Sequence, residues 1–143
     1  EVDMVLNIGR LRSGDFAYVE KDIREVVAAA HACGVKCKVI LENAYLTDEE
    51  KIKACEICEK CGADFTKTST GYAPSGSTVH DIELMRAHTK PEMQVKAAGG
   101  VRTLDATLAV MKAGAVRVGT RSTEKILEEA VEREKAGTLR IPE

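Results

Sequence analysis

The chain contains no tryptophan and few other aromatic residues, three tyrosines and two phenylalanines among its 143 residues. This scarcity counts against a surface on which nucleic-acid bases stack. The formal net charge is only −2, which gives neither nucleic acid nor an anionic membrane a reason to bind. No apolar run approaches the roughly 20 residues that a membrane-spanning helix needs. A composition of 44% apolar and 31% charged residues instead predicts a globular domain with a buried core.

Cysteine is present in an odd number, five, which argues against a disulfide framework and predicts free thiols in the cytoplasm. Three of them, Cys55, Cys58 and Cys61, have the spacing of an iron–sulfur or zinc motif. The same spacing puts them on one face of an expected helix, where a free cysteine packs as a small hydrophobe. No fourth ligand follows at a suitable spacing, so we favour buried thiols over a metal site.

Helical and strand patterns alternate along the chain. Three times an expected helix ends in a glycine that precedes a strand, at Gly34, Gly62 and Gly114. Thr47 begins a capping-box pattern at another helix start. The expected strands cover residues 2–8, 36–42, 63–68, 93–97 and 115–118, and the expected helices cover 15–33, 47–61, 78–88, 103–113 and 122–135. This alternation predicts βα units and a parallel sheet.

The polarity of alternate strand positions favours one of two architectures. In an open, doubly wound sheet the strands are nearly continuous apolar runs. Here one parity is polar, as at Asp3, Lys38 and Lys67, while the other is apolar, as at Met4 and Val39. A (β/α)8 barrel gives this pattern, because its interior accepts polar groups near the active end. We therefore expect one partial (β/α)8-barrel domain over residues 1–143, with about five units and the other three before residue 1.

Two lysines near strand ends are the main candidates for chemistry. Lys67 and Lys96 each close an apolar strand and precede small residues and glycine. A single strand lysine is most simply an end residue that reaches water. Two matched lysines at the face where βα loops begin indicate a site. Neighbouring ammonium groups disfavour each other's charge, and burial disfavours the charge of both. One amine is then neutral and able to form a Schiff base with a carbonyl, and Asp3 is the expected counter-charge of the second lysine.

Two glycine-containing loops, 99–103 and 119–123, each join a strand to a helix. Glycine lets an anion approach the backbone, and a helix N-terminus directs N–H groups toward it. Glycines also serve tight turns alone. Because both loops follow the last two strands, where barrels commonly bind phosphate, we expect a phosphate site there.

The segments Asp64–Gly71 and Val95–Thr103, each with its lysine, resemble the deoxyribose-phosphate aldolase family (DeoC-type class I aldolases). Residues 1–9 and 38–42 match that family too, so the resemblance covers essentially the whole chain and corresponds to strands four to eight of its barrel. It implies reversible cleavage of 2-deoxy-D-ribose 5-phosphate to D-glyceraldehyde 3-phosphate and acetaldehyde. It also implies no metal and no organic cofactor.

The resemblance also assigns roles to residues. Lys67 would be the Schiff-base lysine, Lys96 the second lysine whose charge lowers the pKa of Lys67, and Asp3 the partner of Lys96 in a proton relay. The expected phosphate-binding residues are Gly71, Gly99, Gly100, Arg102, Gly119 and Ser122. The chain departs from the family at Arg121, where many members have a small residue, and at Tyr72, where some have lysine.

Two other hypotheses stay open at this point. The Schiff base could act on another phosphorylated aldehyde or ketose. Alternatively, the chain is a catalytically silent phosphate-binding fragment that associates with another chain, because an open sheet has unpaired edges. A homo-oligomer is compatible with each hypothesis, whereas partners other than a small sugar phosphate are not indicated.

Overall fold

The chain folds into a parallel sheet of five strands covered by helices. A computed structural model describes residues 1–142. The strands are β1 (Val2–Val5), β2 (Cys37–Ile40), β3 (Phe65–Lys67), β4 (Gln94–Ala98) and β5 (Arg117–Gly119). The helices are α1 (Ile8–Arg12), α2 (Phe16–Ala32), the 3-10 turn η1 (Asn43–Tyr45), α3 (Asp48–Lys60), α4 (Val79–Ala87), α5 (Leu104–Lys112) and α6 (Thr123–Lys135).

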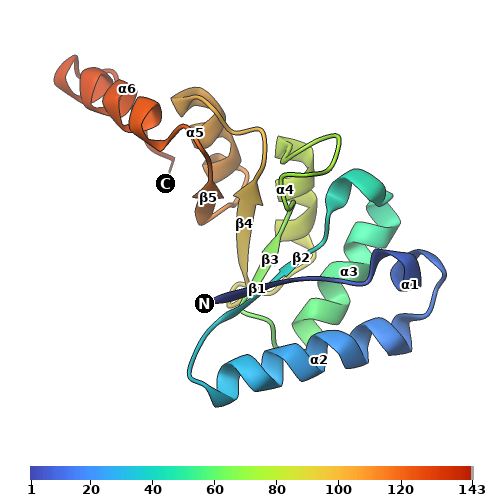
Figure 1. Ribbon diagram of the computed structural model, residues 1–143. Helices are drawn as coiled ribbons and strands as arrows, with labels where there is room; N and C mark the ends of the chain where they lie inside the picture. Colours follow the sequence, from blue (N-terminus) through green and yellow to red (C-terminus); the bar gives the residue numbers. More distant parts are fainter. Residues whose placement is uncertain (143) are drawn as a thin grey trace.

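The strand order distinguishes the two architectures. Each strand pairs in parallel with the next one along the chain, which gives the order β1-β2-β3-β4-β5. A doubly wound sheet reverses direction at a switch point, and this sheet does not. Successive helices from α2 to α6 contact one another, and α2 to α5 follow one side of the sheet (Figure 1). The α/β class with about five barrel units, expected from strand parity, is thereby confirmed.

The two faces of the sheet differ in chemistry as the parity predicts. On the helix-covered face, Val39, Val95 and Ala97 are fully buried and contribute to the hydrophobic core. The opposite parity carries charged side chains, including Lys38 at the middle of β2 and Lys96 on β4. Burying the apolar row beneath the helices fixes the register, so the charged row must face the barrel interior.

The first expected strand is shorter than the sequence indicates. We expected residues 2–8, but β1 ends at Val5 and the helix α1 begins at Ile8. Asn7 caps α1, because its side-chain oxygen accepts a hydrogen bond from the Arg10 backbone N–H at 3.0 Å. Asparagine is among the best N-cap residues, and this local bond outweighs the strand pattern of Leu6 and Ile8.

The cysteine-rich helix is a packing element. Cys55, Cys58 and Cys61 of α3 and its C-cap are buried, and all five cysteines are free thiols. Burial raises the pKa of the Cys55 thiol to about 12 and also raises the pKa of the Cys58 thiol well above its usual value. These thiols therefore stay protonated at neutral pH and act as small hydrophobic groups, which is the interpretation favoured above.

No helix within residues 1–142 is both long and apolar enough to cross a bilayer.

Candidate active site

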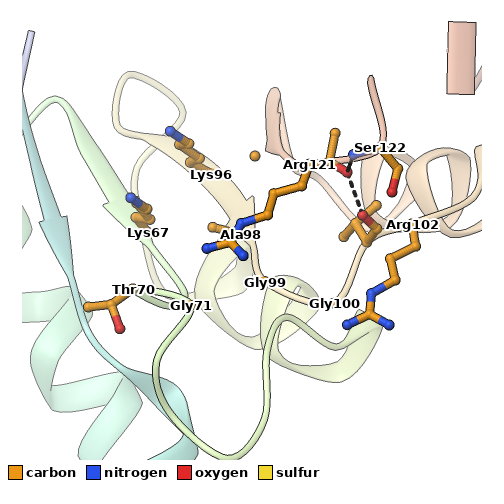
Figure 2. Close-up of a pocket in the computed structure, with 13 residues that line it drawn as sticks. Lys67, Thr70, Gly71, Lys96, Ala98, Gly99, Gly100, Arg102, Arg121 and Ser122 are labelled. Carbon is orange, nitrogen blue, oxygen red and sulfur yellow. Dashed lines mark hydrogen bonds between the residues drawn. The ribbon is translucent and has the colours of Figure 1, made fainter. Parts of the chain in front are cut away.

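Lys67 and Lys96 lie side by side on adjacent strands, Lys67 at the end of β3 and Lys96 at the middle of β4. They are register partners in the parallel β3–β4 pair. Both side chains face the same pocket, as Figure 2 shows. The Lys67 side chain is only 12% exposed, so its amine is withdrawn from bulk water while still reaching the pocket. The neighbouring positions of the two lysines, expected from strand parity, are thereby confirmed.

Asp3 contacts different lysines from the one expected. Its carboxylate lies 2.7 Å from the Lys67 Nζ and 2.5 Å from the Lys38 Nζ. We expected it to pair with Lys96, and that pairing is wrong. Asp3 is the register partner of Lys38 on β2, whereas Lys96 lies two strands further away on β4. Burial opposes ionisation of Asp3, but its two lysine partners outweigh burial and lower its pKa to about 2.

Lys96 has the opposite electrostatic situation. Burial lowers the pKa of its ammonium group, and the positive charges of Lys67, Lys38 and Arg117 lower it further, with Asp3 opposing them. Lys96 forms no ion pair with residues 1–142. A lysine whose pKa is lowered gives up its proton more readily at neutral pH. Lys96 is therefore suited to exchange protons within the pocket near neutral pH.

A further row of charge lies beneath the two lysines. Glu1 is 3.4 Å from the Lys38 Nζ and forms a close ion pair with Arg117 on β5. The Arg117 guanidinium also lies over the ring of the buried Phe65, 4.6 Å from its centroid. These contacts cross the open face of the sheet from β1 to β5. They hold the interior charges in fixed positions below the pocket.

The loop that follows Lys67 is fixed on both sides. The Thr68 hydroxyl donates to the Ala98 carbonyl on β4 and accepts from the Ala98 N–H, both at 3.0 Å. The Thr70 N–H donates to the Glu42 carboxylate at 3.2 Å, and the Thr70 hydroxyl donates to the same carboxylate. The two threonines of the Lys-Thr-Ser-Thr-Gly segment are therefore tethered to opposite neighbours of β3. Sequence reasoning missed Thr68, Thr70 and Glu42.

The pocket is a cavity of about 320 Å³ at the carboxyl ends of β3, β4 and β5. This volume is in the range of small-ligand sites. The expected residues all line it except Asp3, which lies below. Its lining consists of Lys67, Thr70, Gly71, Lys96, Ala98, Gly99, Gly100, Val101, Arg102, Gly119, Thr120, Arg121 and Ser122.

The two glycine loops form one wall of this pocket. Gly99 and Gly100 both have left-handed backbones, with φ of +82° and +81°. The Thr120 hydroxyl joins the loops, since it donates to the Val101 carbonyl at 2.7 Å and accepts from the Ser122 N–H at 2.9 Å. Helix α6 begins directly after Ser122. Glycine-rich backbone at a helix N-terminus is a favourable place for an anion.

The charge of the pocket lining is entirely positive. Lys67, Lys96, Arg102 and Arg121 line the cavity, and no aspartate or glutamate does. Figure 2 shows the Arg121 side chain reaching across the pocket toward Ala98, whereas Arg102 extends beyond Gly100. Among residues 1–142 no ion pair neutralises either arginine. The pocket is therefore suited to a small anionic ligand.

Groups of three or more histidine, cysteine, aspartate or glutamate side chains that could hold a metal ion do not occur within the described part of the chain.

Comparisons with known proteins agree with one another. A family model described as DeoC/LacD family aldolase matches residues 1–132. A protein of Thermococcus gammatolerans named deoxyribose-phosphate aldolase is 58% identical over 130 residues, which is 91% of this chain and 58% of that protein. The corresponding protein of Clostridium perfringens (strain 13) is 55% identical over 128 residues, 90% of this chain and 57% of its own length. The chain thus spans about 58% of the curated relatives that it matches.

Solved structures resemble the chain in the same way. The structure called "QR15, an Aldolase" superimposes with a TM-score of 0.87 at 39% identity, covering 95% of this chain and 61% of that one. A tetrameric deoxyribose phosphate aldolase from Aeropyrum pernix gives a TM-score of 0.79 at 31% identity, covering 89% and 53%.

Proposed function

The chain belongs to the DeoC/LacD family of aldolases, and on this premise we propose that it carries the catalytic centre of a class I aldolase acting on 2-deoxy-D-ribose 5-phosphate. One observation supports the proposal above all others. Lys67 and Lys96 are register partners on adjacent strands, and the pocket they face has two glycine loops for its wall.

In this proposal, Lys67 is the nucleophile. Its neutral amine attacks the aldehyde carbon of the open-chain sugar, water leaves, and a protonated Schiff base forms. A base removes the proton of the C3 hydroxyl, the bond between C2 and C3 breaks with release of D-glyceraldehyde 3-phosphate, and its electron pair moves into the Schiff base to leave an enamine. Protonation of the enamine carbon then gives the imine of acetaldehyde. Hydrolysis of the remaining imine returns the Lys67 amine and releases acetaldehyde. No metal or organic cofactor takes part in these steps.

Lys96 and Asp3 are the charged residues that act on Lys67. Lys96 places a positive charge beside Lys67, and neighbouring ammonium groups disfavour each other's charge. The lowered pKa of Lys96 also supports a role in proton transfer within the pocket, because acid–base groups act best when they titrate near the working pH. Asp3 contacts Lys67 directly and Lys38 on its other side. Because Asp3 stays ionised over the whole working range, it stabilises a positive charge on the nitrogen of Lys67, including that of the protonated Schiff base.

The phosphate would occupy the glycine-loop wall. Gly71, Gly99, Gly100 and Gly119 let it approach the backbone, and Ser122 and Arg102 donate to it. Arg121 supports a variation on this proposal, in which the sugar phosphate is another aldehyde or ketose. A side chain that reaches across the cavity reduces the room beside the lysines and adds a donor there. Turnover of several sugar phosphates by the intact protein would separate the two substrates.

Reductive trapping tests the central step. The intact protein is incubated with acetaldehyde and sodium borohydride, and the modified peptide is located by mass spectrometry. We expect a single two-carbon adduct on Lys67 and its loss in Lys67→Met. An adduct on Lys96 would reverse the roles of the two lysines. The absence of any adduct in an enzyme that cleaves deoxyribose 5-phosphate would contradict Schiff-base chemistry altogether.

We also propose a cellular location, an oligomeric state and a domain organisation for the protein. Five free cysteines support a reducing, cytoplasmic location. A homo-oligomer is supported by the tetramer described for the Aeropyrum pernix relative. Buried apolar residues between Leu6 and Ala115 form one hydrophobic core, which supports one domain.

A further inference from the structure

Glu42 has a backbone conformation that is unusual for its residue type. It is the one non-glycine residue with a positive φ among residues 1–142, with φ of +55° and ψ of +60°. A side chain with a Cβ is disfavoured there, and glycine, asparagine or aspartate is the usual choice. Residues held in such conformations cluster at functional sites, where the surrounding structure maintains them.

The conformation of Glu42 has a clear geometric result. The Leu41 N–H still bonds to the Lys67 carbonyl at 2.9 Å, as in a continuing β2–β3 ladder. After the turn at Glu42, the Asn43 N–H bonds to the Thr68 carbonyl at 3.0 Å. The chain therefore leaves the sheet at Glu42 while its neighbours keep their bonds to the segment that bears Lys67.

The Glu42 side chain completes the arrangement from inside. The residue is only 4% exposed, so its carboxylate is buried. Both carboxylate oxygens lie near the Thr70 N–H, at 3.2 and 3.3 Å, and one accepts the Thr70 hydroxyl proton. The same hydroxyl oxygen accepts the Tyr72 N–H at 3.2 Å. Charge-assisted hydrogen bonds of this kind are strong and directional.

These contacts connect a residue outside the pocket to its wall. Glu42 does not line the cavity, but Thr70 and Gly71 do, three and four residues after Lys67. On the other side, Thr68 binds the Ala98 backbone. We propose that Glu42 is a positioning residue for the aldolase reaction, which fixes the Thr70–Gly71 backbone, and thereby the Lys67 amine, through its buried carboxylate. This inference rests on the function proposed above.

The first test separates the side chain from the backbone conformation. In Glu42→Gly the positive φ costs nothing, but the carboxylate is lost. If Glu42 serves only the turn, this variant keeps its activity. We expect instead that kcat falls by about ten- to a hundredfold, as for a catalytic group displaced by about 1 Å, while KM changes by less than about threefold. Wild-type kcat in a folded Glu42→Gly protein would overturn the proposal.

The second test uses the conservative variant and the partner residue. Glu42→Gln keeps the length and one acceptor oxygen, so its kcat is expected between those of the wild type and Glu42→Gly. Thr70→Val removes the hydroxyl. The double variant of Glu42→Gln and Thr70→Val should show a decrease in the logarithm of kcat that is much smaller than the sum of the two single decreases. Additive losses, or an unchanged kcat in Glu42→Gln, would overturn the proposal even if Glu42→Gly fails to fold.

A matched control addresses general destabilisation. Asp81 is another buried carboxylate, 6% exposed, which pairs with Lys51 at 2.7 Å between α4 and α3. Asp81→Asn should lower Tm without changing kcat per folded molecule. Borohydride trapping of the wild type distinguishes failure of the proposed aldolase function from failure of the proposed role of Glu42. If the wild type forms no adduct and cleaves no sugar phosphate, the proposed aldolase function is wrong. If the wild type is active and Glu42→Gly is equally active, only the proposed role of Glu42 is wrong.

Discussion

Lys96 places a buried positive charge among other cations, so its effects on stability and on activity should have opposite signs. Its lowered pKa means that the folded state resists protonation of this amine, first because of burial and then because of Lys67. Keeping the positive charge of Lys96 in the folded protein at pH 7 therefore lowers the stability of the fold. We expect Lys96→Met to raise Tm and to lower kcat by at least about a hundredfold, as expected for loss of general acid–base catalysis.

The measurement pairs thermal denaturation with initial rates of deoxyribose 5-phosphate cleavage by the intact protein. Lys112, an exposed lysine of α5, provides the control. Lys112→Met should change neither quantity appreciably. A Lys96→Met protein that loses stability would show that Lys96 is held by favourable contacts instead.

Asp3 should make stability depend on pH in the acid range. Its folded pKa of about 2 lies below its usual range near 3.9. A depressed carboxylate pKa contributes stability that is complete above the unfolded pKa and is lost as pH falls through the folded one. The difference in stability between wild type and Asp3→Asn should therefore shrink from about pH 4 to about pH 2. Urea midpoints measured between pH 2 and 7 test this, and a difference that stays constant with pH would contradict it.

Arg121 should contribute to the affinity for the phosphate group. It lines the pocket with no carboxylate beside it in the lining. A hydrogen bond to a charged group contributes about 1.5–3 kcal/mol. We therefore expect Arg121→Ser to raise KM for deoxyribose 5-phosphate by roughly tenfold or more. Inorganic phosphate should become a weaker inhibitor by a similar factor. Cleavage of unphosphorylated deoxyribose is the internal control, and an equal loss on both sugars would argue against a phosphate contact.

At the scale of elements, the loop between β3 and α4 depends on a close approach to the glycine wall. A Cβ on Gly76 would lie 2.3 Å from the Gly99 carbonyl oxygen, and the next residue, Ser77, donates its N–H to that oxygen at 2.9 Å. Gly76→Ala must therefore push the loop away from Gly99 or displace the glycine-loop wall of the pocket. We expect a lower Tm together with a raised KM, measured by calorimetry and steady-state kinetics.

Gly9 supplies the matched control for this change. It lies inside α1, and a Cβ there would meet only the Asn7 side chain at an ordinary 3.7 Å. Gly9→Ala should leave KM unchanged and stabilise the protein by about 0.5–1 kcal/mol, because alanine is the better helix former. If both variants behave alike, the contact between Gly76 and Gly99 does not matter for the pocket.

At the scale of the whole molecule, the open sheet predicts association of the 143-residue chain. Within the described residues, β1 and β5 each pair with one strand only. Apolar side chains are exposed at these ends: Val5 is 43% exposed on β1 and Leu127 is 60% exposed on α6. Unpaired strand edges and apolar patches favour contacts with other chains. The chain expressed alone should therefore self-associate and show an apparent mass that falls on dilution.

Analytical ultracentrifugation over a range of concentrations measures this association. Val5→Lys and Leu127→Glu place charges at the two ends and should shift the chain toward the monomer. Val79→Lys, a similarly exposed valine at the start of α4, should have no such effect. A 143-residue monomer with full aldolase activity would contradict both the predicted association and the catalytically silent alternative.

The repeated βα units, the boundaries of α2 to α6 and the neighbouring lysines can be predicted from the sequence, whereas α1 cannot. These features are encoded within a few residues. Thr47, for instance, caps α3 through a reciprocal bond with Glu50, and the side-chain parity of β3 and β4 turns Lys67 and Lys96 toward one face. Strand alternation in a parallel sheet then places both amines at one edge, so no knowledge of distant contacts is needed.

Only the tertiary structure decided which partners these residues have. Asp3 meets Lys67 across 64 residues of sequence, and Glu42 meets Thr70 across 28. Such contacts depend on strand register and on the left-handed turn at Glu42, which leaves no periodic signal in the sequence. Charge alone suggested a partner for Lys96. The strand order places Asp3 with Lys38 and Lys67 instead, because a carboxylate on β1 lies nearer to β2 and β3 than to β4.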